Sequence, residues 1–170
     1  HLAGGYVMKN TGDMFKLVFV SAREAVAYCV VVQEALMAAE WPEHMLNKYP
    51  EFKGHTYVST RPGTPDQVAF RGPRVRIAVQ NFEREKGLCA QYDDDGQLLD
   101  LQGPDAQQCT QMLRMCMGGE ILISTRTHQL TKGVEFPLVS AQPEIQELPE
   151  VRKVRADVPL EKPVYQVFPS

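Results

Sequence analysis

The chain has 170 residues, which is long enough for one domain with a substantial hydrophobic core. Hydrophobic residues make up 44% and charged residues 23%, proportions that are typical of a soluble globular protein. The net charge of −3 argues against a nucleic-acid surface, because phosphate binding needs clustered Lys and Arg. The longest apolar run, residues 25–32, is too short to span a bilayer.

The cysteines and histidines show no spacing typical of metal ligands. Cys109 and Cys116 lie seven residues apart, so both fit one buried face of a helix. We interpret the cysteines as structural thiols of a reducing compartment rather than as disulfides. The chain begins at His1, so we expect a cytoplasmic piece of a longer protein, which itself could be attached to a membrane or belong to a larger assembly.

The first twenty residues predict a β-hairpin. Residues 6–8 and 15–20 favour strands, and residues 10–13 favour a tight turn between them. Gly12 can supply the positive φ of such a turn, and Asp13 tolerates the position beside it. Considered alone, Asp13 is therefore interpreted as a turn residue.

A helix and an insertion are predicted next. Ser21 and Glu24 form a capping box, and apolar residues at helical spacing extend the helix over residues 22–41. Pro42 bars a simple continuation. Residues 42–73 contain five prolines and predict a long insertion on the surface, which we expect to be functional.

The middle of the chain predicts strand, turn, strand and helix. Charged and apolar residues alternate over residues 74–80, as in a strand. The acidic run at residues 93–96 is interpreted as a solvated turn, because it lacks the alternation and the distal Glu of a calcium loop. A short strand at residues 97–101 precedes a helix at residues 104–117. The predicted buried face of that helix consists of Ala106, Cys109, Leu113 and Cys116.

The last fifty residues are rich in strand patterns. We expect a strand at residues 120–124 and a short helical turn at residues 126–130. Three further strands are expected at residues 136–139, 151–158 and 163–168. This order of elements predicts an α+β domain in which helices cover one face of a sheet.

Residues 4–19 resemble a specific pattern, the GGY-x-x-K-x-x-GD-x-F-x-x-x-F hairpin of class III nucleotide cyclases, especially fungal and protist adenylate cyclases. The matching residues are Gly4, Gly5, Tyr6, Lys9, Gly12, Asp13, Phe15 and Phe19. In that family the Asp binds a catalytic Mg²⁺ ion and the Lys contacts the purine ring. The resemblance implies these roles for Asp13 and Lys9. The Trp41-Pro42 pair also resembles the start of the family's insertion.

Residues 99–111 resemble the family's D-x-x-G-P-x-V-N-x-A-A-R segment. The matching residues are Asp100, Gly103 and Pro104. The resemblance implies that Asp100 reads the purine edge together with Lys9, a pairing similar to the adenine-selective version of the family. The family's Asn and Arg fall on Gln107 and Gln111. A neutral amide does not replace the charge of that Arg beside the transferring phosphorus.

Plainer interpretations of the same residues stay open. Lys9 would then be a solvated strand residue, and Asp100 a strand-end acid that caps the following helix.

The strand before that helix also departs from the family. The family's R-I-G-I-H-x-G falls on residues 76–82, which lack both glycines and the His.

The order of elements resembles the class III cyclase fold from its second strand onward. The resemblance implies one cyclase homology domain over residues 1–170, ferredoxin-like, with a mixed, mainly antiparallel sheet and an insertion at residues 42–73. The family's first strand and first two helices would lie before residue 1. That strand carries the family's second metal-binding Asp.

In this family the ribose 3′ oxygen of ATP attacks the α-phosphorus, and two Mg²⁺ or Mn²⁺ ions assist the loss of pyrophosphate. Each site lies between two cyclase-type domains of a homo- or heterodimer. Two hypotheses follow: an impaired or inactive domain for dimerisation or scaffolding, or the metal-side half of an adenylate cyclase that a partner domain completes in intracellular signalling. An RNA-binding ferredoxin-like sheet is disfavoured, because no strand carries paired exposed aromatic residues.

Overall fold

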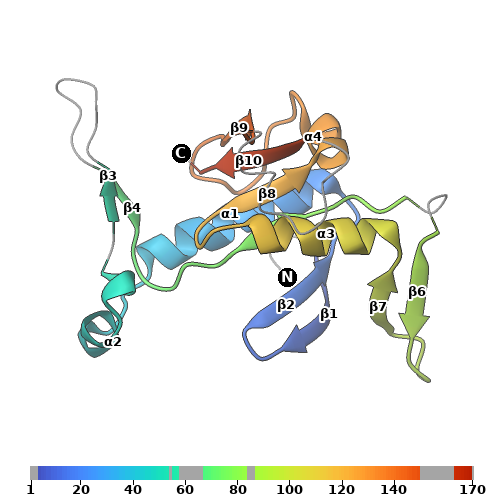
Figure 1. Cartoon of the computed structure of the whole chain (residues 1–170), viewed down its shortest axis with the longest axis horizontal. Coiled ribbons are helices and arrows are strands. Elements are labelled where there is room, and N and C mark those ends of the chain that lie inside the picture. The colour runs from blue at the N-terminus through green and yellow to red at the C-terminus, as the bar shows by residue number, and fades with distance from the viewer. Residues whose placement is uncertain (1–3, 54, 58–66, 84–86, 150–162, 170) are drawn as a thin grey trace.

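The computed structural model describes residues 4–53, 55–57, 67–83, 87–149 and 163–169 (Figure 1). Its central sheet has four strands in the order β5 (Ile77–Val79), β8 (Ile121–Ser124), β10 (Val164–Phe168) and β9 (Glu144–Glu147). Strand β5 is parallel to β8, whereas β10 is antiparallel to both β8 and β9. The predicted α+β architecture with a mixed, mainly antiparallel sheet is confirmed.

The two longest helices, α1 (Ala22–Ala38) and α3 (Pro104–Met115), pack against opposite faces of this sheet. Successive side chains of a strand point to opposite faces, so Ile121 and Ile123 join the core beneath α1, whereas Leu122 joins the core beneath α3. The prediction that helices cover one face is therefore wrong. Strand β8 is a continuous apolar run because both of its faces are buried.

Helix α1 begins at the predicted capping residue but ends earlier than expected. The Ser21 hydroxyl accepts a hydrogen bond from the Glu24 backbone N–H at 3.5 Å, which satisfies one of the helix's free donors. The helix stops at Ala38, and the Trp41 indole then donates to the Leu36 carbonyl at 2.8 Å. Gly72 packs directly on that indole, where any side chain would clash.

Two hairpins lie side by side beneath the central sheet (Figure 1). They are β1 (Tyr6–Thr11) with β2 (Met14–Val18), and β6 (Cys89–Tyr92) with β7 (Leu98–Gln102). The first hairpin confirms the prediction, and Gly12 has the expected positive φ of 65°. Strand β6 was not predicted, whereas the acidic turn before β7 was: the Asp93 carboxylate accepts from the backbone N–H groups of Asp95 and Gln97.

The segment after Trp41 extends away from the sheet at one end of the molecule (Figure 1). It contains α2 (Glu43–Lys48), the short 3₁₀ helix η1 (Pro50–Phe52), β3 (His55–Tyr57) and β4 (Gln67–Phe70). Strands β3 and β4 form their own antiparallel pair. In the part of the chain that the structure describes, no helix has the length and apolar character needed to cross a membrane.

The C-terminal part differs most from the sequence-based expectations. Residues 136–139 are not a strand, because the Gln142 side chain both accepts from the Phe136 N–H at 2.7 Å and donates to its carbonyl at 3.1 Å. Strand β9 was not predicted, and the strand expected at residues 151–158 lies outside the described residues. The final strand, β10, and the short helix α4 (Thr125–Thr131) confirm the predictions.

Two other elements differ from the predictions: one strand is shorter, and one helix buries a different set of side chains. The strand expected at residues 74–80 is restricted to β5. Cys116 is buried as predicted, but Ala106, Cys109 and Leu113 are only half-buried, and helix α3 buries Asp105, Met112 and Met115 instead. The reason is that the helix packs against the edge strand β5 as well as β8, and a buried acid faces the loop after β5.

Candidate functional site

Asp13 lies at the tip of the β1–β2 hairpin and is exposed to solvent. Its position follows from the turn, since Gly12 takes the left-handed conformation and leaves the next carboxylate outside the sheet. The described residues contain no group of three His, Cys, Asp or Glu side chains that could hold a metal ion. Among these residues Asp13 is thus a single exposed carboxylate without the co-ligands of a metal site.

Lys9 and Asp100, to which the resemblance assigns the purine, lie on the neighbouring strands β1 and β7, but the lysine that contacts Asp100 directly is Lys16. The Lys16 ammonium donates to Asp100 Oδ1 at 2.9 Å. Lys9 on β1 lies directly opposite Lys16 on β2, so both side chains emerge from one face of the hairpin. Strand β1 contacts β7, which carries Asp100. We call Lys9, Lys16 and Asp100 the charged corner.

The electrostatics of this corner keep Asp100 ionised. The hydrogen bond from Lys16 lowers the pKa of the Asp100 carboxyl, partial burial opposes this shift, and the Leu101 N–H and the charges of Lys16 and Lys9 lower the pKa further. The Leu101 N–H donates to the same oxygen, Oδ1, at 3.0 Å. The carboxylate is thus a fixed acceptor with its charge balanced by lysines.

The interpretation of Asp100 as a helix cap is wrong. Asp100 lies inside β7, and the N-cap of α3 is Gly103, which makes no side-chain capping bond. Gly103 has a φ of 123°, and a Cβ atom there would lie 2.6 Å from the Gly87 carbonyl oxygen. Only glycine fits this close approach, so the Gly-Pro step turns the chain from β7 directly into α3.

Helix α3 carries the two glutamines, Gln107 and Gln111, that the sequence resemblance aligned with the family's Asn and Arg. Gln107 is exposed and Gln111 is half-buried, and their spacing of four residues places them on one side of the helix. Neither side chain makes a hydrogen bond within the part of the chain that the structure describes. They supply hydrogen-bonding groups but no positive charge at this position.

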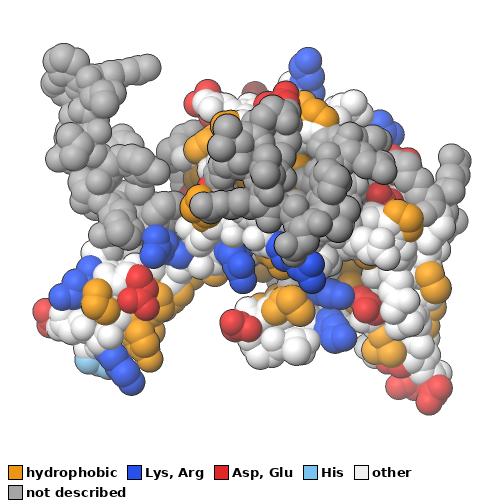
Figure 2. All heavy atoms as spheres, viewed as in Figure 1, with side chains coloured by type: hydrophobic (Ala, Val, Ile, Leu, Met, Phe, Trp, Pro, Cys, Tyr) orange, Lys and Arg blue, Asp and Glu red, His pale blue; other side chains and the backbone are white. Residues whose placement is uncertain are grey.

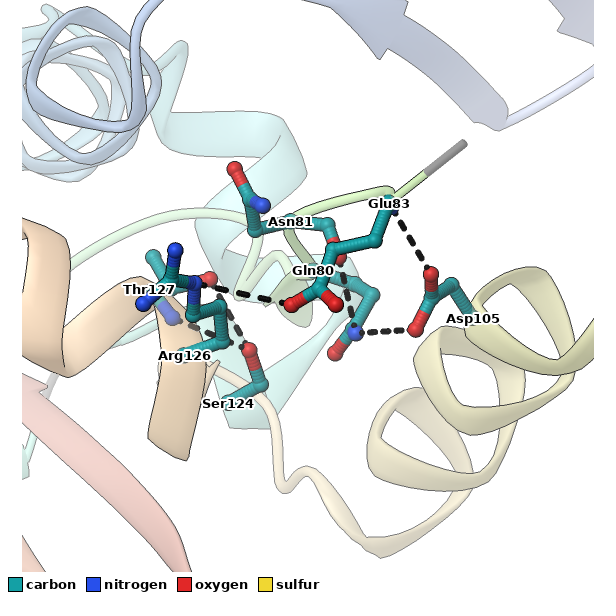
Figure 3. A network of polar contacts seen from close by, with 7 residues as sticks. All are labelled: Gln80, Asn81, Glu83, Asp105, Ser124, Arg126 and Thr127. Carbon is teal, nitrogen blue, oxygen red and sulfur yellow. Dashed lines mark hydrogen bonds and ion pairs between the residues drawn. The ribbon is translucent and has the colours of Figure 1, made fainter. Parts of the chain in front are cut away.

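A polar network that the sequence did not reveal fixes the start of α3 (Figure 3). The buried Asp105 carboxylate accepts from the Gln80 amide at 2.9 Å and from the Glu83 backbone N–H at 3.0 Å. Glu83 also pairs with Arg126 at 3.5 Å. The network ties the loop after β5 to both α3 and α4, and so holds the helix that carries Gln107 in place.

The four thiols differ in their surroundings, and Cys89 is exposed to solvent. All four cysteines are free, and Cys29 and Cys116 are buried. Burial raises the pKa of Cys29 to about 12 and that of Cys109 to about 11, so neither forms the reactive thiolate at neutral pH. The charge of Lys16 in the charged corner lowers the pKa of Cys109 and so opposes the effect of burial.

No family model matches the chain, but comparisons with known proteins find adenylate cyclases. Over 140 residues the chain is 26% identical to an adenylate cyclase of Schizosaccharomyces pombe, and the match covers 82% of this chain and 8% of that protein. Over 124 residues it is 25% identical to an adenylate cyclase of Podospora anserina, covering 72% and 5% respectively. The chain therefore spans less than a tenth of the length of these relatives.

A solved structure has the same fold. An adenylate cyclase from Trypanosoma brucei, determined in its monomeric state, superposes with a TM-score of 0.62 at 18% sequence identity. The match covers 96% of this chain and 71% of that one. The class III cyclase fold expected from the hairpin and the helix-entry segment is confirmed.

Proposed function

Because this chain is related to the fungal adenylate cyclases and has the class III cyclase fold, we propose that it is a catalytically impaired cyclase homology domain that acts by dimerisation or scaffolding. One feature supports this proposal: α3 carries Gln107 and Gln111, which the resemblance aligns with the family's Asn and Arg. Losing one preorganised contact of this kind lowers a rate on the order of 10²–10³-fold. The domain would therefore turn over nucleotide very slowly on its own.

The proposal assigns residual binding roles to three residues. Lys9 and Asp100 would contact the purine of a bound ATP, and Asp13 would contribute one ligand to Mg²⁺ or Mn²⁺. A bound divalent ion would neutralise charge on the leaving pyrophosphate. The exposure of Asp13 at the hairpin tip suits a carboxylate whose co-ligands come from elsewhere.

The partner surface we propose is the hairpin together with the glutamine side of α3. The hairpin exposes Val7 to 54% and Phe15 to 58%, and Figure 2 shows hydrophobic side chains beside charged ones at its surface. Apolar side chains left open in this way are typical of a protein–protein contact. A second cyclase-type domain, identical or different, is the partner that the sequence resemblance implies.

Sedimentation equilibrium tests this proposal. The unmodified chain should form dimers at micromolar concentration, and Phe15→Asp should shift it to monomer. Val20→Asp is the matched control, since Val20 is 99% exposed just beyond the hairpin and should leave the dimer intact. A chain that stays monomeric and captures no cyclase-type domain would contradict the proposal.

A second candidate function is the metal-side half of an active adenylate cyclase in intracellular signalling. The retained Asp13 at an open hairpin tip favours it. The test extends this chain by the N-terminal strand that the resemblance expects before residue 1, and mixes it with an adenylate cyclase domain that keeps its own Asn and Arg but has its metal-binding Asp residues replaced by Ala. Activity that appears on mixing and disappears with Asp13→Asn would establish this second function, and its absence would favour the scaffold.

A further inference from the structure

The charged corner contains two lysines, although one lysine is enough to contact a purine base together with Asp100. The additional lysine is Lys16. Lys9 and Lys16 lie opposite each other on one face of the hairpin, and Lys16 rather than Lys9 donates to Asp100. Like charges directly opposite on a hairpin repel, and the Asp100 carboxylate offsets that repulsion. The sequence resemblance gave Lys16 no role.

The corner is open enough for a ligand to reach it. The Lys16 side chain is 40% exposed and the Asp100 side chain 19% exposed. Both hydrogen bonds to the carboxylate, from Lys16 and from the Leu101 N–H, use Oδ1. Oδ2 has no hydrogen-bond partner among the residues that the structure describes, so an incoming donor can use it.

The hydrogen-bonding pattern of the corner is an acceptor accompanied by two donors. A lysine ammonium only donates, and an ionised Asp only accepts. The edge of adenine offers a donor, its amino group, beside an acceptor, N1. The edge of guanine offers an acceptor, O6, beside a donor, the N1 hydrogen. Each purine therefore needs one donor and one acceptor from the protein, but in the opposite order along its edge.

We infer that Lys16 is a specificity-determining residue that lets the charged corner hold guanine as well as adenine. Adenine would donate from its amino group to Asp100 and accept at N1 from Lys9. Guanine would donate from N1 to Asp100 and accept at O6 from Lys16. This inference rests on the proposed purine-binding role of Lys9 and Asp100, and it identifies the ligand class as purine nucleotides of both kinds.

Competition binding tests the inference on the purified chain. A fluorescent ATP derivative is displaced by ATP or by GTP in the presence of Mg²⁺, and the affinities of the two nucleotides should differ by less than about threefold. Lys16→Met should weaken GTP about tenfold and change ATP by less than about twofold, because one base contact to guanine is lost. Lys9→Met is the matched control and should do the reverse.

Two further variants separate base reading from other effects. Asp100→Ala should weaken both nucleotides, because both purines donate to this carboxylate. Lys16→Arg should retain GTP binding, because a donor remains. Unchanged thermal unfolding of each variant shows that a loss of binding is not a loss of folding.

Three results would overturn the inference. Equal weakening of ATP and GTP by Lys16→Met would show that Lys16 only attracts phosphate. No change would show that Lys16 does not reach the base. Failure of the unmodified chain to bind either nucleotide would exclude any base-reading role, while the scaffold proposal, which is tested by sedimentation and by turnover, would stand.

Discussion

The central sheet and the two hairpins beneath it differ in how they tolerate substitution. Ile121, Leu122 and Ile123 of β8 are completely buried, whereas Val7 and Phe15 of the first hairpin are more than half exposed. The buried strand is specified by shared apolar volume, which many side chains can supply. The chemistry that we propose beside the hairpins would depend on single charged groups, which other side chains cannot replace. This contrast would allow a chain to keep the cyclase fold after losing a single charged group, as we propose for Gln111.

The largest effect on stability is expected in the central sheet. Leu122→Ala removes a fully buried side chain from the core beneath α3 and should lower the free energy of unfolding by about 2–5 kcal/mol. Urea unfolding followed by circular dichroism measures it. Val20→Ala, at a position that is 99% exposed, should stay within about 0.5 kcal/mol. Similar losses in both variants would contradict the contrast.

The second-largest effect on stability is expected in the polar network at the start of α3. Asp105→Ala removes one acceptor of the Gln80 amide, which keeps the Asn81 carbonyl, and removes the acceptor of the half-buried Glu83 N–H. The free energy of unfolding should fall by about 1–3 kcal/mol. Asp94→Ala, in the exposed acidic turn, is the control and should cause no measurable change. A silent Asp105→Ala would mean that the network does not hold the helix.

The cap of α1 should have a moderate effect. Ser21→Ala removes the hydroxyl that accepts from the Glu24 N–H, and should reduce stability by about 1 kcal/mol. Ser21→Asp keeps an acceptor and should preserve stability. If both variants unfold at the same urea concentration as the unmodified chain, the observed capping bond contributes nothing.

The charged corner should contribute least, and its contribution should depend on pH. Because the pKa of Asp100 is lowered in the folded chain, its stabilisation is present above the unfolded value of about 3.9 and is lost as pH falls through the folded value. Lys16→Met should cost less than about 1 kcal/mol at pH 7, since the pair is partly exposed. The difference between variant and unmodified chain should shrink below about pH 4. A difference that is independent of pH would show that Asp100 is not the partner.

Local patterns in the sequence predicted much of the fold. The hairpin turn at Gly12, the cap at Ser21, the buried strand β8 and the final strand β10 each follow from neighbouring residues, and the structure confirms them. Long-range contacts were beyond these patterns. The Gln142 side chain replaces a strand partner for Phe136, and the buried Asp105 faces a loop more than twenty residues away.

Part of the charged corner, the pairing of Lys9 with Lys16, can be predicted from the sequence. A two-residue turn at Gly12 and Asp13 pairs Thr11 with Met14 and therefore Lys9 with Lys16. Counting back from the turn predicts that both lysines share a face. Their contact with Asp100 depends on how the two hairpins pack together, and no local pattern specifies that packing.

The production of cyclic nucleotide tests the central claim most directly. The purified chain is incubated with ATP or GTP and with Mg²⁺ or Mn²⁺, and the cyclic product is quantified against a sample without protein. The absence of a positive charge at Gln111 predicts product at background with either nucleotide. Robust turnover by the chain alone would contradict the impaired-domain account and would require another group to supply the missing charge.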